Sequence, residues 1–209
     1  MQLSVLAILV SLLTSVNSLL SLRGNWSLID VRFLFFLALG QFPAIVFGIG
    51  LLNFLESNEV WILKVILGSF LVLGGLLSFI NPRPLKRISG RLTVFLAGIL
   101  GGTLGGLFSA SGPVLGLFAY SQPMPLAQIR ATLLASFLFT TTARTAVVSF
   151  KGSIKPEILM LFLLALPIVL LGTFLGKKTL LPVSESTTRR FAFSIILMIG
   201  FWTVLETIL

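Results

Sequence analysis

The residues best suited to bind a ligand form the step Ser109-Ala110-Ser111-Gly112-Pro113, which ends a glycine-rich stretch. Pro113 has no N–H and disfavours helical backbone at Gly112, so a helix cannot run smoothly through this step. Pro113 also suits the first turn of a following helix, whose free N–H groups favour an anion. The two serine hydroxyls add hydrogen-bond donors. These five residues are therefore a candidate anion-binding site, and a purely structural kink is the alternative.

Arg144 is the one basic residue well inside a long apolar stretch, and Thr140, Thr141 and Thr142 precede it by about one helical turn. An arginine that faces the interior of a helix bundle would attract the same anion. It stands six residues before Phe150, about 9 Å along a helix, so its side chain could also reach the membrane surface. Thr140, Thr141 and Arg144 join the candidate binding residues, with a surface-reaching Arg144 as the alternative.

Four further polar residues lie at the corresponding depth of the first apolar stretch: Ser11, Thr14, Ser15 and Asn17. They are candidates for the opposing wall of a binding cavity. The alternative role is hydrogen bonding between helices, which polar side chains often provide inside membranes.

The sequence contains few of the residues that catalysis or metal binding requires. The sequence has no histidine and no cysteine, and none of its six carboxylates lies securely in the middle of an apolar stretch. Disulfides, zinc sites and catalysis by cysteine or histidine are thereby excluded, and a serine protease would lack the histidine that takes the proton. We expect no catalytic residue, no bound metal and no cofactor, so the chain is not predicted to be an enzyme.

The composition tells which elements must position these residues. Of the 209 residues, 56% are hydrophobic and 10% are charged, whereas a soluble domain has about 25% charged residues. The basic residues sit mostly in short connectors, as topology determinants do, so the net charge of +9 does not indicate a nucleic-acid partner. The composition predicts an all-α, polytopic helix bundle of about seven spans whose partner is the lipid bilayer.

A spanning helix needs about 20 apolar residues. The stretches of that length are 2–22, 29–54, 60–80, 129–150, 157–181 and 190–208. The remaining stretch, 92–122, is broken at the serine-glycine-proline step, so we expect a broken helix or a re-entrant hairpin there. The glycines from Gly98 to Gly106 leave one face of its first helix bare, which would let a neighbouring helix approach closely.

The two halves of the chain resemble each other at an offset of 128, which places Gly24 over Gly152 and Gly48 over Gly176. The predicted domains are a first repeat at 1–80, a basic loop at 81–91 and a second repeat at 92–209 that opens with the glycine-rich element. The first repeat would then lack that element, through truncation, a misassigned start or natural reduction. The repeat could be inverted or parallel, as in other transporters; the alternative is the general likeness of polytopic proteins.

The charges favour one orientation. If 92–122 enters and leaves on the same side, eleven basic residues face that side and three face the other; if it crosses once, the split is eight to six. Cytoplasmic loops carry the excess of lysine and arginine. We therefore expect a re-entrant segment and a cytoplasmic loop at 81–91.

The run Gly101-Gly102-x-x-Gly105-Gly106-Leu107-Phe108-Ser109-Ala110-Ser111-Gly112-Pro113, followed by Ile129-Arg130-Ala131-Thr132 and Gly152, resembles the second half of the sulfite exporter TauE/SafE family. The resemblance covers essentially the whole chain and is closest at 98–132. It implies a bacterial inner-membrane permease for sulfite, sulfonates or other small organosulfur anions. Two departures stand out: the family pattern usually has glycine at the positions of Ser109 and Ser111, and the first glycine-rich motif is missing.

These features together predict a secondary transporter of a small anion, which rocks one repeat against the other and binds its substrate at the break and the Thr140–Arg144 patch. The alternative is a degenerate or accessory membrane protein of the same family without transport activity. A homo-oligomer is compatible with either.

Overall fold

The computed structural model describes residues 3–58, 85–150 and 156–178, together with several positions between 61 and 72 and Met198. Within these residues every regular element is helical, which confirms the all-α prediction. The elements are α1 (Leu3–Leu22), the 3-10 helix η1 (Trp26–Leu28), α2 (Val31–Asn58), α4 (Arg91–Phe108), α5 (Gly112–Tyr120), α6 (Leu126–Phe150) and α7 (Pro156–Lys178). Among the described helices, five are long and apolar enough to cross a membrane: α1, α2, α4, α6 and α7. The spans expected at 60–80 and 190–208, and the repeat residue Gly152, lie wholly or largely outside the described residues.

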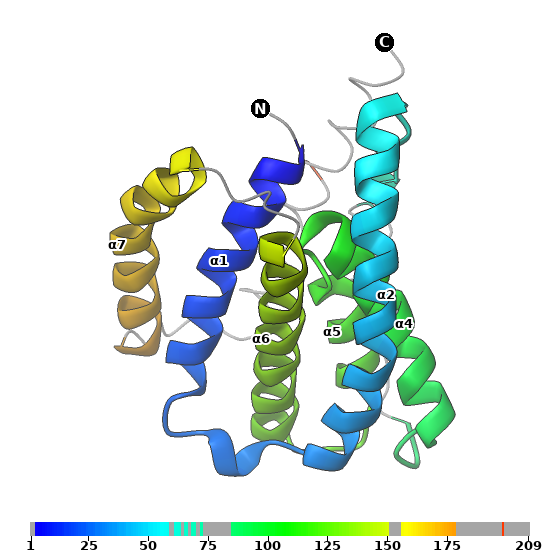
Figure 1. Cartoon of the computed structure of the whole chain (residues 1–209). Coiled ribbons are helices and arrows are strands. Elements are labelled where there is room, and N and C mark those ends of the chain that lie inside the picture. Colours follow the sequence, from blue (N-terminus) through cyan, green and yellow to red (C-terminus); the bar gives the residue numbers. More distant parts are fainter. Residues whose placement is uncertain are drawn as a thin grey trace.

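The helices form a bundle in which α6 lies between α1 and the pair α2 and α4, and α7 packs on the far side of α1 (Figure 1). Asp30 fixes the start of α2, because its carboxylate Oδ1 accepts a hydrogen bond from the Phe33 N–H at 2.9 Å. Its own N–H donates to Thr132 Oγ1 on α6 at 3.0 Å. The chain turn before α2 is thereby joined to the start of α6.

Helices α2 and α4 make the closest contact in the bundle, through glycine. A Cβ atom added to Gly102 would lie 2.6 Å from the Gln41 carbonyl oxygen, and one added to Gly106 would lie 2.5 Å from that of Ile45. On the other helix, Gly40 and Gly48 face the α4 backbone in the same way. Of the glycine face predicted on 98–106, Gly98, Gly102 and Gly106 are therefore the surface on which α2 packs, whereas Gly101 faces Leu115 on α5 and Gly105 faces Thr140 on α6.

The two parts of the broken element, α4 and α5, form a hairpin. The Leu85 N–H, before α4, donates to the Ser121 carbonyl oxygen, after α5, at 2.8 Å. The Ser89 N–H donates to Oε1 of the buried Gln122 at 2.9 Å. The segment thus begins and ends at the same end of the bundle, where η1 and the start of α6 also lie (Figure 1). This is the re-entrant arrangement that the fold prediction included.

Candidate functional site

The candidate site is built around the break between α4 and α5. Ser109 ends α4 in left-handed conformation, with φ of 57°, and its N–H donates to the Gly105 carbonyl oxygen at 2.9 Å. Helix α5 begins at Gly112 with Pro113 in its first turn, as the sequence predicted. Two helix ends therefore meet within a few residues: the carbonyl end of α4 and the N–H end of α5.

The N–H groups at this break are mostly unused by the protein. Among the described residues, no protein acceptor bonds the N–H of Ala110, Ser111 or Val114, whereas the Leu115 N–H donates to the Ser111 carbonyl oxygen at 3.1 Å. The Ser111 side chain is 4% exposed, and its hydroxyl has no hydrogen-bond partner in the described part of the chain. Free helix N–H groups carry partial positive charge, so this end of α5 offers donors to an anion.

A cavity of about 220 Å³ opens onto these donors. Helix α1 contributes Thr14 to it, and α6 contributes Phe137 and the buried Thr141. The rest of its lining is the break itself: Ser109, Ala110, Ser111, Gly112 and Pro113. We call this space the break cavity; it combines hydroxyl and backbone donors with one aromatic wall.

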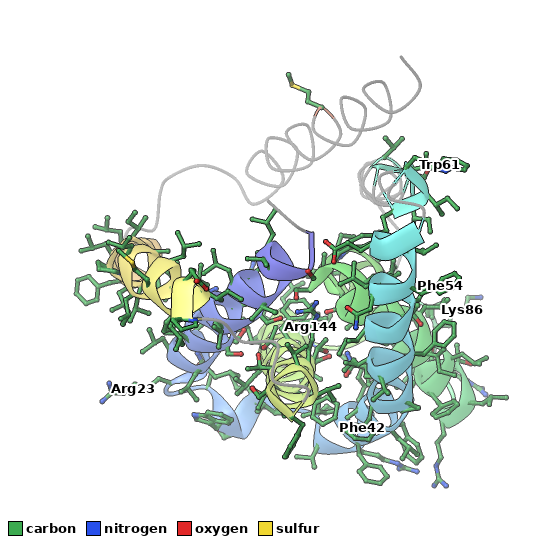
Figure 2. All side chains as sticks on the ribbon, turned by 45° about the horizontal axis from the view of Figure 1, so that its top comes forward. Arg23, Phe42, Phe54, Trp61, Lys86 and Arg144 are labelled. Carbon is green, nitrogen blue, oxygen red and sulfur yellow. The ribbon has the colours of Figure 1, made fainter. Side chains whose placement is uncertain are left out.

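Arg144 lies in the middle of the bundle, while Phe42, Phe54 and Trp61 point outward from α2 and the segment after it (Figure 2). Its side chain is 1% exposed, so it lies inside the bundle and does not reach the membrane surface. Its Nε donates to the Gly106 carbonyl oxygen at 3.0 Å, and its Nη1 donates to Ser11 Oγ at 3.2 Å. Among the described residues no carboxylate forms an ion pair with it.

The guanidinium therefore neutralises the carbonyl end of α4 and leaves the N–H end of α5 uncompensated. It also reaches the break cavity indirectly, because Ser11 Oγ lies 2.6 Å from Ser109 Oγ. Ser109 Oγ in turn donates to the Ala7 carbonyl oxygen at 2.7 Å. Arg144 is thus separated from the cavity wall by a single serine hydroxyl, which places a positive charge near the cavity.

Of the other candidate residues from the sequence, some support the break cavity and some lie elsewhere. Ser15 donates to Thr141 Oγ1 at 2.8 Å and so supports the cavity wall, and Ser11 joins Arg144 to Ser109. Thr140 is not part of the break-cavity lining, and its Oγ1 accepts a hydrogen bond from Gln41 Nε2 at 2.9 Å. Asn17 belongs elsewhere: it accepts a hydrogen bond from Thr173 on α7 at 2.7 Å. It lies three residues beyond Thr14, about one turn along α1, which takes it out of the break cavity.

Two residues at or near the site were not among the candidates: Phe137 and Gln41. Gln41 is fully buried in the apolar helix α2, and its Nε2 also donates to Ser136 Oγ on α6 at 3.0 Å. A lone glutamine amide in the middle of a spanning stretch was a usable signal, since such groups must find partners inside the bundle. Phe137 gave no signal, because phenylalanine recurs throughout the chain.

We predict that Ser109→Gly is more stable than Ser109→Ala, although both lose the hydroxyl contacts to Ser11 and Ala7. The left-handed conformation costs an alanine about 1 kcal/mol and costs glycine nothing. Thermal unfolding of the two variants in detergent measures the difference. An alanine variant as stable as the glycine variant would show that the backbone is not left-handed at this residue.

Comparison with known proteins is consistent with this geometry. The family model described as "Sulfite exporter TauE/SafE" matches residues 1–203. A protein of Cupriavidus necator named "Probable sulfite/organosulfonate exporter TauE" is 37% identical over 194 residues, which are 93% of this chain and 76% of that protein. No solved structure shows significant similarity to the chain. The extent of the family match and the identity to this relative show that the chain belongs to the sulfite exporter TauE/SafE family, whose members are membrane transporters.

Proposed function

We propose that this chain exports a small anion, sulfite or an organosulfonate, across a bacterial cytoplasmic membrane, and that the anion binds in the break cavity. The observation that carries the proposal is a positively polarised helix end with unused N–H groups, facing a cavity inside the bundle. The name of the Cupriavidus relative gives the substrate class. The basic end of the bundle, with the loop at 81–91, faces the cytoplasm in this proposal.

The lining of the cavity matches the two parts of such an anion. The oxygens of a sulfite or sulfonate group accept hydrogen bonds from the Ser111 hydroxyl and from the N–H groups at the start of α5. The ring of Phe137 also lines the cavity, with its Cζ 3.8 Å from where a Cβ atom of Gly112 would lie, and it provides an apolar surface beside these donors for a short carbon chain. Arg144 contributes charge through Ser11 and Ser109 without touching the substrate.

Transport then requires two bodies that move against each other. Helices α2 and α4 pack backbone to backbone through glycine, so they move together. The wall that α1 and α6 supply is joined by the Ser15–Thr141 hydrogen bond. The break cavity lies between these bodies, so rocking one against the other would open it to either end, as in other transporters built from repeats.

Replacing Ser111 by alanine tests the site. We expect kcat/KM for sulfite to fall at least tenfold, because a hydrogen bond to a charged group contributes about 1.5–3 kcal/mol. Uptake of labelled sulfite into inside-out vesicles measures the flux. Ser149→Ala is the matched control, since the Ser149 hydroxyl is exposed and donates within α6 to the Thr145 carbonyl oxygen.

The two negative outcomes have different meanings. Unchanged flux in Ser111→Ala would show that the anion does not bind in the break cavity. A wild-type chain that folds, inserts and moves neither sulfite nor a sulfonate would support the alternative, a member of the family without transport activity.

A further inference from the structure

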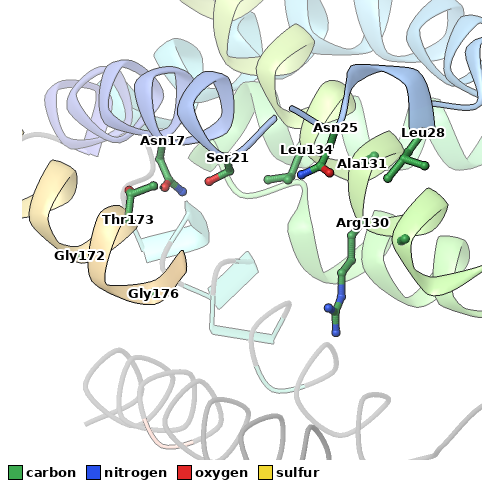
Figure 3. Close-up of a pocket in the computed structure, with 11 residues that line it drawn as sticks. Asn17, Ser21, Asn25, Leu28, Arg130, Ala131, Leu134, Gly172, Thr173 and Gly176 are labelled. Atoms are coloured by element: carbon green, nitrogen blue, oxygen red, sulfur yellow. Dashed lines mark hydrogen bonds between the residues drawn. The ribbon is translucent and has the colours of Figure 1, made fainter. Parts of the chain in front are cut away.

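A second and larger cavity, of about 490 Å³, lies at the basic end of the bundle. The end of α1, η1, the start of α6 and the end of α7 surround it, and Arg130 projects beside it (Figure 3). Its polar lining includes Asn17, Ser21, Asn25 and Thr173. We call it the basic-end cavity.

The two cavities are lined by the same faces of the same two helices. On α1 the break cavity is lined by Thr14, and the basic-end cavity by Asn17 and Ser21, three and seven residues further on. Residues at these spacings share one helix face. The two cavities therefore follow each other along one side of α1.

Helix α6 repeats the pattern. Its residues Thr141 and Phe137 line the break cavity, and Leu134 and Arg130 line the basic-end cavity, at successive spacings of four, three and four. These four residues again share one face. Phe137 and Leu134 are less than one turn apart, about 4.5 Å along the axis, so only a thin layer of side chains separates the cavities.

The layer between the cavities contains an unused hydroxyl. Ser18 lies on α1 between Thr14 and Ser21, is 1% exposed, and its Oγ has no hydrogen-bond partner among the described residues. A buried hydroxyl without a partner is costly, so it suggests a group that bonds there at some stage. Thr14, Ser18 and Ser21 thus form a ladder of hydroxyls from one cavity to the next.

Two glycines of α7, Gly172 and Gly176, border the basic-end cavity. A Cβ atom added to Gly172 or Gly176 would meet nothing within 4 Å, whereas one added to Gly48, 128 residues before Gly176, would collide with the α4 backbone. The positions paired by the repeat offset are therefore used differently. Gly48 permits close packing, and Gly176 borders free space.

We propose that the basic-end cavity is an antechamber that collects the small anion through Arg130 and passes it along the Thr14–Ser18–Ser21 ladder to the break cavity. The inference rests on the proposed function for the identity of the anion. It gives Arg130, which lies in the family motif Ile129-Arg130-Ala131-Thr132, a role in capturing substrate. The cavity lies at the end from which an exporter must take up its cargo.

Cysteine labelling tests the antechamber without requiring transport, because the native chain contains no cysteine. The single variants Ser21→Cys and Thr14→Cys are treated with anionic and cationic methanethiosulfonates. The labelling rate of each reagent is divided by its rate with a small free thiol in solution, which corrects for the intrinsic reactivity of the reagent. We expect both cysteines to react from the basic end and to prefer the anionic reagent. Adding Arg130→Gln should lower that preference about fivefold at both positions, and Arg130→Lys should retain it.

Leu19→Cys is the matched control, since Leu19 is 53% exposed on another face of α1 and would face lipid. It should react with neither charged reagent. The antechamber would be disproved if the preference of Ser21→Cys for the anionic reagent did not change when Arg130 is replaced. It would also be disproved if Thr14→Cys did not react with reagent added from the basic end. Both results would leave the Ser111→Ala flux test untouched, so the two proposals fail separately.

Discussion

Replacing Arg144 by glutamine is expected to lower sulfite flux about 100-fold while leaving the protein folded. The Arg144 charge lies two short hydrogen bonds, through Ser11, from Ser109 at the break cavity. Over about 6 Å at an effective dielectric constant near 20, a unit charge contributes about 3 kcal/mol to holding an anion, which corresponds to that factor. Initial rates of labelled sulfite uptake into vesicles measure the loss.

Stability should respond differently from flux, which separates an electrostatic role from a structural one. Arg144 has no carboxylate partner among the described residues, so burying its charge is costly, and removing the charge offsets the two lost hydrogen bonds. We expect the melting temperature of Arg144→Gln in detergent to stay within about 5 °C of the native value. A variant that unfolds instead would show that the guanidinium is needed chiefly to hold α4.

Arg144→Lys provides the matched control. Lysine keeps the positive charge, but its ammonium group has a different geometry from the planar guanidinium. It therefore cannot reproduce both hydrogen bonds, to the Gly106 carbonyl oxygen and to Ser11 Oγ. We expect it to retain about a tenth of the native flux, well above the glutamine variant. Equal losses in the two variants would indicate that hydrogen-bond geometry matters and charge does not.

The parts of this site that the sequence predicts are those that depend on local backbone chemistry. A proline after glycine ends a helix wherever it stands, so the break at 109–113 and the helix starting at its end could be predicted from five residues. The glycine face on 98–106 predicted a close neighbour for the same reason. The composition predicted the helical bundle, because so few charges cannot cover a surface in water.

The remaining features depend on how one helix is rotated against another. Asn17 and Thr14 differ by one turn, and only the packing of α1 against α6 and α7 shows that they face different cavities. Arg144 could have reached the surface from its position in the sequence; what holds it inside is the Gly106 carbonyl oxygen, on a helix that begins more than fifty residues earlier. Such contacts are set by tertiary packing, which spacing along one chain segment does not record.

A large loss of stability is expected from Gly48→Ala, with Gly50→Ala as its control. Both glycines lie in α2, two residues apart, and each would gain one methyl group. At Gly48 the added Cβ atom would collide with the Thr103 carbonyl oxygen and lie 3.0 Å from the Gly106 Cα atom, whereas at Gly50 it would meet nothing within 4 Å. The α4 atoms in its way are backbone, so relief requires the two helices to separate.

We therefore expect Gly48→Ala to be destabilised by about 2–3 kcal/mol, the usual cost of overpacking a tight interface. Gly50→Ala should be unchanged or stabilised by up to about 1 kcal/mol, because alanine favours the helix more than glycine does. Thermal unfolding in detergent compares the pair. If the two variants melt together, α2 and α4 do not pack through their glycines, and the rigid body that rocking transport requires would be lost. Since α4 also carries the break cavity at its end, Gly48→Ala should reduce flux too, through a residue that contacts no substrate.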